Sequence, residues 1–257
     1  EIRLSLVGSE MCIRDRPLTS RTAIPCTTAI PVPICDVRAH PRFLVTSVGL
    51  RRMGATLRGM TDFDADITLT GSLVRLEPLT LEHHDGLVDA VNDGEMWTRW
   101  YTSVPRADGV RAMIEQRLAW RESGFMVPFV AVRLADEQVL GCTTFYDIVD
   151  AVPRVSIGYT WNRASTHGTG TNAESKLLLM TYAFETVGVE CVRYETSWMN
   201  QQSQAAIERL GARRDGVLRA DRREGNGALG DKVVYSILAH EWPASKASLE
   251  ARLAKRR

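Results

Sequence analysis

A loop with two glycines stands between a predicted strand and a predicted helix, and it is the first part of this sequence that could do chemistry. The segment reads IGYTWNRASTHGTGTNAESKLLL, with Gly168 and Gly170 just before the helical periodicity begins. Unpaired backbone N–H groups and the positive end of the helix dipole favour an anion at such a place. The loop therefore predicts a site for phosphate or pyrophosphate oxygens, although glycines also serve as simple turn residues.

Two familiar phosphate-binding motifs do not fit this loop. Walker A requires Lys followed by Ser or Thr after its last glycine, whereas Thr171 and Asn172 follow Gly170. The dinucleotide-binding motif requires a third glycine and a parallel β-α-β unit, and an antiparallel meander is predicted before this loop. Both interpretations are therefore weakened.

A second polar group stands at MNQQSQAAIERLGA, after a predicted strand at 191–198 with alternating apolar residues. Asn200 is a typical helix N-cap, and Gly211 is a typical residue to end a helix. The pattern predicts a short helix between them. Ser203 falls in its first turn, where the hydroxyl can help to satisfy backbone amides.

The elements that must position these residues alternate between strands and helices without a long linker. This order predicts an α/β (α+β) fold in a single domain, with one mixed and strongly twisted sheet flanked by helices. Pro128 predicts that the strand over 126–134 lies near a sheet edge or carries a bulge there. The helix over 172–187 is expected to place Leu177, Leu178, Thr181 and Phe184 on its apolar face. The other predicted strands cover 73–79, 139–148, 154–161, 217–218 and 233–238, and the other predicted helices lie near 81–91, 110–118 and 242–253.

The first 59 residues differ in composition from the rest of the chain. They hold nine Arg, no Lys and four acidic residues, and Phe43 is their only aromatic residue. Residues 1–16 also resemble the translated read-through of a sequencing adapter. We therefore expect 1–59 to be a non-native or disordered extension, and 60–257, which begins at Met60, to be the folding domain. An Arg-rich transit peptide is the alternative, because the segment is poor in acids.

The composition of the whole chain excludes several classes of partner. The formal net charge of +1 provides no basic field that would attract nucleic acid or an anionic membrane. No apolar run approaches the roughly 18 residues of a membrane span. After residue 59 only Cys142 and Cys191 remain, each within a predicted strand, so neither a disulfide framework nor a metal site is indicated. Reduced thiols in the cytoplasm are expected.

Four motifs, in order and spacing, resemble the GNAT acetyltransferases, most closely their RimJ/RimL-type branch. HGTGTN is similar to the family pattern Q/R-x-x-G-x-G/A, with His167 at the first position, Gly170 at the glycine and Asn172 at the last. IGYTW resembles the fourth strand of the family, MNQQSQAAIERLGA resembles its N-x-x-S motif and following helix, and DKVVYSILAHEWP resembles the closing strand and tail of the branch. The resemblance covers about 69–253. His167 departs from Gln or Arg, and Asn172, which can cap the helix, departs from a small residue.

The resemblance implies that the protein binds acetyl-CoA as a co-substrate. Asn200 would hold the cofactor arm, and the edge of the strand over 154–161 would pair with the pantetheine. The loop would bind the pyrophosphate through residues His167, Gly168, Thr169, Gly170, Thr171 and Asn172.

The resemblance also implies direct attack of an amine on the thioester. This reaction needs a route for the proton, polarisation of the carbonyl and stabilisation of the leaving thiolate. A backbone N–H at Tyr159 or its neighbours would polarise the carbonyl. Many members stabilise the thiolate with a Tyr seven residues after the motif Asn, but Ile207 stands there. The Ser that the RimJ/RimL-type branch uses instead is present as Ser203.

The general base is less defined. Glu224, Asp221 and Asp231 lie where the branch often places an acidic group, around the glycine-rich segment EGNGALG. Solvated loop charges and proton transfer through water are the alternatives. We take Glu224 as the candidate base.

The acceptor is expected to bind near three aromatic residues that follow the first predicted helix, Trp97, Trp100 and Tyr101. The alternative is that these rings form a small satellite core. Tyr235 would face the acceptor if its neighbour Val234 faces the core. The resemblance implies a protein N-terminal amine as acceptor, with a small-molecule amine as the enzymatic alternative. A non-catalytic acyl-CoA-binding module is the alternative of another class. The protein would act as a monomer or a homodimer.

Overall fold

The computed structural model describes residues 63 and 65–255 of the chain. The extension predicted over 1–59 lies outside the described residues. In the described part, no helix combines the length and the apolar character that crossing a bilayer requires.

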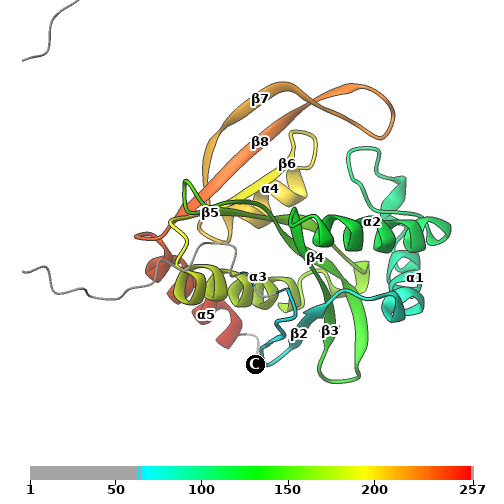
Figure 1. The fold of residues 1–257 in the computed structure, drawn as a ribbon, viewed down its shortest axis with the longest axis horizontal. Coiled ribbons are helices and arrows are strands. Elements are labelled where there is room, and N and C mark those ends of the chain that lie inside the picture. Colours follow the sequence, from blue (N-terminus) through cyan, green and yellow to red (C-terminus); the bar gives the residue numbers. More distant parts are fainter. Residues whose placement is uncertain (1–62, 64, 256–257) are drawn as a thin grey trace, which may run out of the picture. The chain divides into compact units, whose positions relative to one another are not determined.

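Eight strands form one mixed sheet in the order β1-β2-β3-β4-β5-β6-β8-β7 (Figure 1). Every neighbouring pair is antiparallel except β5 and β6, which are parallel. The predicted α/β fold with a mixed sheet flanked by helices is thereby confirmed. The strands are β1 (Leu69–Thr70), β2 (Val74–Pro78), β3 (Met126–Arg133), β4 (Gln138–Val149), β5 (Arg154–Asn162), β6 (Cys191–Ser197), β7 (Arg213–Arg223) and β8 (Leu229–Leu238).

Helices cover both faces of this sheet. The α-helices are α1 (His84–Asn92), α2 (Val110–Glu122), α3 (Thr171–Thr181), α4 (Gln201–Glu208) and α5 (Trp242–Ala254), and a π-helix, η6 (Tyr182–Val187), continues α3. The short 3-10 helices are η2 (Leu81–His83), η3 (Met96–Thr98), η4 (Ala107–Gly109) and η5 (Ala164–Thr166).

Two buried clusters lie on opposite faces of the sheet, as alternate residues of β3 show. Phe129 and Ala131 join the cluster that includes residues of α3 and α5, whereas Val130 and Val132 join the cluster under α1 and α2. In Figure 1, α3 and α5 run beside each other. The ring centroids of Phe184 and Trp242 stack 5.3 Å apart between η6 and α5.

The parallel ladder between β5 and β6 is short. It pairs only Arg154 with Cys191, Val155 with Val192 and Ser156 with Arg193. Beyond Ser156 the two strands have no ladder contact in the described structure, although β5 continues to Asn162 and β6 to Ser197. The sheet is therefore split between the C-terminal halves of β5 and β6, which diverge.

Three details differ from the predictions. The strand with Pro128 is internal, and its register shift lies between Ala131 and Val132. Pro128 pairs with Thr144 on the β4 side. Proline is tolerated because, on the other side, β2 ends at Pro78, and there the carbonyl of Pro128 accepts a hydrogen bond from the amide of Leu79 at 3.0 Å. The weak strand predicted at 217–218 extends over the whole of β7.

The apolar face predicted for the helix after the glycine loop is confirmed only in part, because Leu177, Leu178 and Phe184 pack against the buried cluster but are not the most buried side of the helix. Leu179, Met180 and Ala183 are buried, whereas Leu177 and Leu178 are only partly buried. The buried face includes the polar residues Glu174, Ser175 and Lys176. Because hydrophobic periodicity counts only apolar residues, it could not identify this face.

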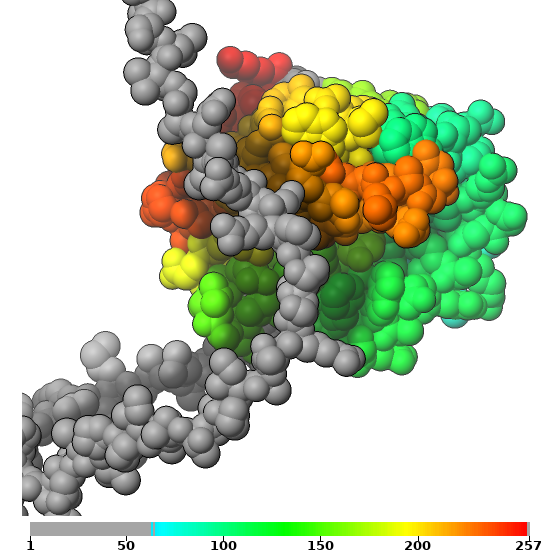
Figure 2. Space-filling model, turned by 90° about the horizontal axis from the view of Figure 1, so that it is seen from above, coloured from blue at the N-terminus to red at the C-terminus, as the bar shows by residue number. Residues whose placement is uncertain are grey.

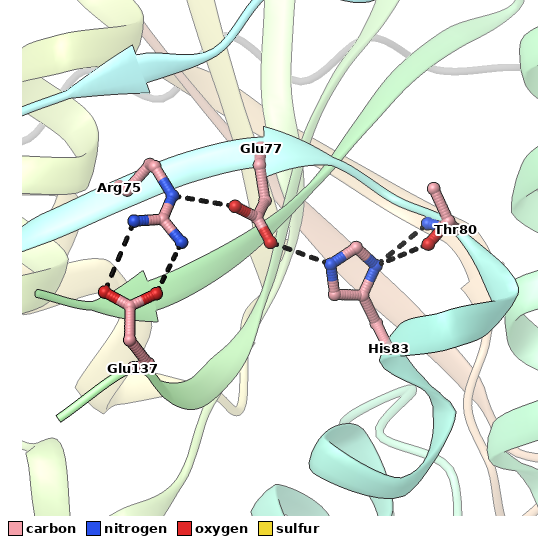
Figure 3. A network of polar contacts seen from close by, with 5 residues as sticks. All are labelled: Arg75, Glu77, Thr80, His83 and Glu137. Carbon is pink, nitrogen blue, oxygen red and sulfur yellow. Dashed lines mark hydrogen bonds and ion pairs between the residues drawn. The ribbon is translucent and has the colours of Figure 1, made fainter.

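A polar network fixes the N-terminal edge of the domain (Figure 3). Arg75 on β2 bonds to Glu77 and, across the sheet edge, to Glu137 in the β3–β4 turn, both at 2.7 Å. Glu77 also contacts His83 Nε2 at 2.8 Å, and the amide of Thr80 donates to His83 Nδ1 at 3.0 Å. This network sets the turn from β2 into α1.

Candidate functional site

A cavity of about 700 Å³ opens where β5 and β6 diverge. Residues 157–162 of β5 and 194–197 of β6 form its two long walls. The loop before α3, the first turns of α4 and the chain after α1 close the ends. Arg99 of that chain donates to Gln202 of α4 at 2.8 Å, and both residues line the cavity.

The glycine loop lies at one end of this cavity. Gly168 and Gly170 have φ of 81° and 102°, a backbone region that L side chains rarely adopt. Gly170 is the N-cap of α3 and has no side chain to cap the first-turn amides. His167, Gly168, Gly170 and Asn172 line the cavity, whereas Thr169 and Thr171 contact each other through their hydroxyls at 3.1 Å. The arrangement can bind an anion through backbone N–H groups.

Asn172 does not cap the helix, contrary to the expectation from the sequence. The helix begins at Thr171, one residue earlier, with Gly170 as its cap. Asn172 instead accepts a hydrogen bond from Asn162 Nδ2 at 3.4 Å, which connects the loop to the end of β5.

Tyr159 stands at a bulge in β5. The register against β4 passes from Cys142–Trp161 to Thr144–Gly158, and Tyr159 has a φ of 48°. Its carbonyl accepts from Nη2 of the buried Arg117 at 3.0 Å. The bulge turns the backbone of β5 at the middle of the cavity wall, where a polarising N–H was expected.

Asn200 and Ser203 lie together at the start of α4, and both line the cavity. Asn200 is the N-cap, as predicted, and its Oδ1 accepts from the amide of Ser203 at 3.1 Å. The N-cap hydrogen bond uses the backbone amide of Ser203. The side-chain hydroxyl of Ser203 can therefore donate a hydrogen bond to a ligand in the cavity.

Lys176 is a cavity residue that the sequence did not reveal as one. Its Nζ donates to the hydroxyls of Thr143 and Thr160, each at 2.7 Å. Burial lowers the pKa of Lys176 to about 7. No carboxylate among the described residues forms an ion pair with it.

Glu195 is a second cavity residue that sequence reasoning missed. It lies on β6, and its Oε2 contacts Lys232 Nζ at 3.2 Å and the Tyr146 hydroxyl at 3.5 Å. Burial, with a further contribution from Glu195, raises the pKa of Tyr159 despite the opposing charge of Arg117. The alternation of CVRYETSW places Glu195 opposite to Tyr194, but one sequence cannot say which side faces a site.

Glu224 is not a solvated loop charge. Its side chain is 1% exposed, accepts from Ser197 Oγ at 2.7 Å and lies 3.1 Å from Arg222 Nε. Glu224 does not line the cavity, but both of these partners do. Its carboxylate therefore lies one side chain away from the cavity.

Tyr235 was expected to face the acceptor and Val234 the core, but β8 has the opposite orientation. Tyr235 is fully buried, whereas Val234 is only partly buried. The Tyr235 hydroxyl donates to Glu208 Oε1 at 3.1 Å and contacts Gln204 Oε1 at 3.3 Å, so it braces α4 rather than facing the cavity.

The two tryptophans lie beside the cavity without lining it. Trp97 borders a separate hollow with Arg106 and Asp108. The carbonyl of Trp100 accepts from Gly225 at 2.9 Å, which joins the chain after α1 to the tip of the β7–β8 hairpin. Figure 2 shows this hairpin, in orange, reaching the green-cyan part of the surface. Tyr101, next in the chain, does line the cavity.

Comparisons with known proteins agree with this geometry. Residues 74–213 match the family model described as an acetyltransferase (GNAT) domain. The chain is 31% identical over 113 residues to YdaF of Bacillus subtilis (strain 168), whose name assigns it provisionally as a ribosomal N-acetyltransferase. That match covers 44% of this chain and 61% of YdaF, so it spans less than two thirds of the relative.

Two solved structures show the same fold. A GCN5-related N-acetyltransferase from Brucella melitensis has a TM-score of 0.65 at 28% identity, covering 72% of this chain and 85% of that one. Mycobacterium smegmatis RimJ, solved in complex with CoA-disulfide, has a TM-score of 0.62 at 21% identity, covering 73% and 95%. The second likeness concerns the fold alone.

Proposed function

Because the chain belongs to the GNAT acetyltransferase family, we propose that it transfers an acetyl group from acetyl-CoA to a primary amine, and that this amine is the N-terminus of a protein. The observation that carries the proposal is the open edge of β5, which lines a cavity and leads to the glycine loop. An extended ligand with an anionic end fits this arrangement, because strand edge and loop both offer backbone hydrogen bonds.

The residues present fit the cofactor that the family implies. A Cβ on Gly168 would meet nothing within 4 Å, so the backbone there is open to a close ligand. The amides of the loop and of the first turn of α3 would bind the pyrophosphate, and Asn200 would contact the arm. Acetyl-CoA would supply the acetyl group as an activated thioester.

Each chemical requirement has a candidate residue on the cavity wall. The backbone at the Tyr159 bulge would donate to the thioester carbonyl, and the Ser203 hydroxyl would donate to the sulfur. Glu224, through Ser197 and water, is the route that we assign to the proton. None of these steps requires a metal.

The acceptor class rests on the relatives. The name of YdaF describes it as a ribosomal N-acetyltransferase, which favours a protein as the acceptor. The cavity extends to the β7–β8 hairpin and the chain after α1, which would receive an N-terminal segment. The free thiols of Cys142 and Cys191 favour a reducing compartment, which we take to be the cytoplasm.

Two measurements test this function. Calorimetric titration of the full chain with acetyl-CoA should show binding, and the absence of heat at submillimolar cofactor would contradict it. Release of free CoA thiol is then measured with a peptide that has a free N-terminus, the same peptide with an acetylated N-terminus, and small amines. Activity on the free peptide alone supports the proposal. Activity on small amines alone indicates a small-molecule enzyme, and binding without turnover indicates a non-catalytic module.

A further inference from the structure

A primary ammonium group of the chain itself is paired with a carboxylate that lines the cavity. Lys232 Nζ is 3.2 Å from Glu195 Oε2 and 2.8 Å from Asp221 Oδ2. Lys232 pairs with Ser197 in the β6–β8 ladder, two residues from Glu195. Lys232 and Glu195 are therefore diagonal neighbours on one face of the sheet.

That face also carries the bulge of β5. The Tyr146 hydroxyl contacts Glu195 Oε2 at 3.5 Å, and the ring centroids of Tyr146 and Tyr159 are 5.0 Å apart. The side chain of Tyr159 in turn contacts Trp120 of α2. Glu195 thus lies near the bulge, on the face opposite to α3 and its glycine loop.

The carboxylate of Glu195 is only partly used. The contacts with Lys232 and Tyr146 both fall on Oε2, and the second of them is long, at 3.5 Å. Its side chain is 26% exposed and lines the cavity. It can therefore accept a hydrogen bond from a group that enters the cavity.

We propose that Glu195 forms the binding site for the ammonium group of the acceptor, and that Lys232, which Asp221 also holds, competes for this carboxylate from within the chain. The site would take a primary alkylammonium, such as the N-terminus of a peptide. This inference rests on the proposed function, and it adds to it the residues that recognise the acceptor.

The chemistry of Lys232 supports the assignment. Burial lowers its pKa, but the bonds to Asp221 and Glu195 outweigh that effect, so the pKa lies above its ordinary value. The group that these carboxylates hold is thus a primary ammonium, the same group that an amine substrate presents. A partly exposed cross-strand ion pair contributes little stability, so an incoming ammonium can displace it at small cost.

The test measures peptide affinity, which does not depend on turnover. Full-length protein saturated with CoA is titrated with a peptide that has a free N-terminus and with the same peptide N-acetylated. In Lys232→Met the Kd of the free peptide should fall about two- to fivefold, because the competitor is gone. In Glu195→Gln it should rise by at least about tenfold, because a charge-assisted bond is lost.

Two controls separate this effect from structural damage. Lys246→Met removes a lysine that is paired with Glu185 at 2.8 Å and does not line the cavity, and it should leave the Kd unchanged. The acetylated peptide should bind wild type and Lys232→Met equally. Circular dichroism and CoA affinity verify that each variant is folded.

The outcomes are distinct. An unchanged or higher Kd in Lys232→Met, or a Kd within twofold of wild type in Glu195→Gln, would overturn the inference. Equal effects on both peptides would also contradict it, because the ammonium would then play no part. Failure of the proposed function shows itself differently, as peptide binding without release of CoA thiol.

Discussion

The hydroxyl of Ser203 can be removed without disturbing the cap of α4, because Asn200 holds the backbone amide of Ser203 and not its side chain. Ser203→Ala should therefore leave the helix intact. We expect kcat to fall about tenfold or more, because the thiolate loses a hydrogen-bond donor, while the Kd of acetyl-CoA changes little. Steady-state kinetics and calorimetry measure the two constants. An unchanged kcat would remove Ser203 from the chemistry.

Lys176 gives a prediction about pH. Its folded pKa is about 7 because of burial, against an ordinary value of 10.5, so the unfolded chain binds one more proton between these values. The free-energy cost of burying Lys176 on folding is therefore largest below about pH 7, and it decreases as the pH rises. Lys176→Met should be more stable relative to wild type at pH 6 than at pH 9. Urea unfolding at both pH values measures this, and a constant or increasing difference would contradict it.

Residues differ in how far the sequence reveals them. The loop glycines, Asn200 and Ser203 were predictable, because each belongs to a local pattern of loop and helix start. Glu195 and Lys176 were not, since strand alternation and helix periodicity place them on a face without saying what that face meets. Tyr235 was misplaced for the same reason, because the side of β8 that faces the core is set by α4.

At the scale of elements, the conformation of the loop before α3 should control cofactor affinity. Gly168 has a φ of 81°, and a Cβ added there would meet nothing within 4 Å, so alanine would strain the backbone without a clash. We expect Gly168→Ala to cost about 1 kcal/mol and to weaken acetyl-CoA binding about fivefold. Gly216→Ala is the matched control, because its Cβ also meets nothing within 4 Å and no positive φ is involved. Equal affinities of the two variants would contradict this prediction.

Element types were more predictable than element contacts. The hairpin of β3 and β4 and the helix closed by Gly188 follow from turn residues and periodicity. The full length of β7 could not be predicted, because its sequence RRDGVLRADRR is mostly charged. Among the described strands it pairs with β8 alone and forms an edge of the sheet. Edge strands often carry charges that discourage association, and such sequences lack a strand signal.

At the scale of the whole molecule, Glu174 joins α3 to the start of the sheet. Its carboxylate accepts from the amides of Ser72, Leu73 and Val74 and from the Ser72 hydroxyl, at 2.6–3.0 Å. Burial raises the pKa of Glu174, but these bonds outweigh it and the pKa lies below its ordinary value. The carboxylate is therefore ionised in the folded protein at neutral pH.

Glu174→Gln should lower the free energy of unfolding by about 2–4 kcal/mol at pH 7, because the amide cannot accept all of these bonds. A depressed folded pKa gives stability that is present above the unfolded pKa and is lost as pH falls through the folded one. The difference from wild type should therefore shrink in acid. Urea unfolding at pH 7 and near pH 4 tests this, with Glu82→Gln as the exposed control. An equal difference at both pH values would argue against it.

The fold as a whole was predictable because four motifs occur in order, whereas the way in which the sheet opens was not. The place where two strands separate depends on pairings between residues that are far apart in the chain, such as Ser156 with Arg193. Local patterns contain no information about where such a ladder stops.

The three-pair ladder between β5 and β6 also bears on how the molecule moves. Five strands lie on one side of it and three on the other, so the two blocks are joined in the sheet by few backbone hydrogen bonds. Small rotations about this seam would widen or narrow the gap without breaking either block. A ligand that bonds to both walls would restrain this motion, and its residence time would then depend on the stiffness of the seam as well as on its own contacts.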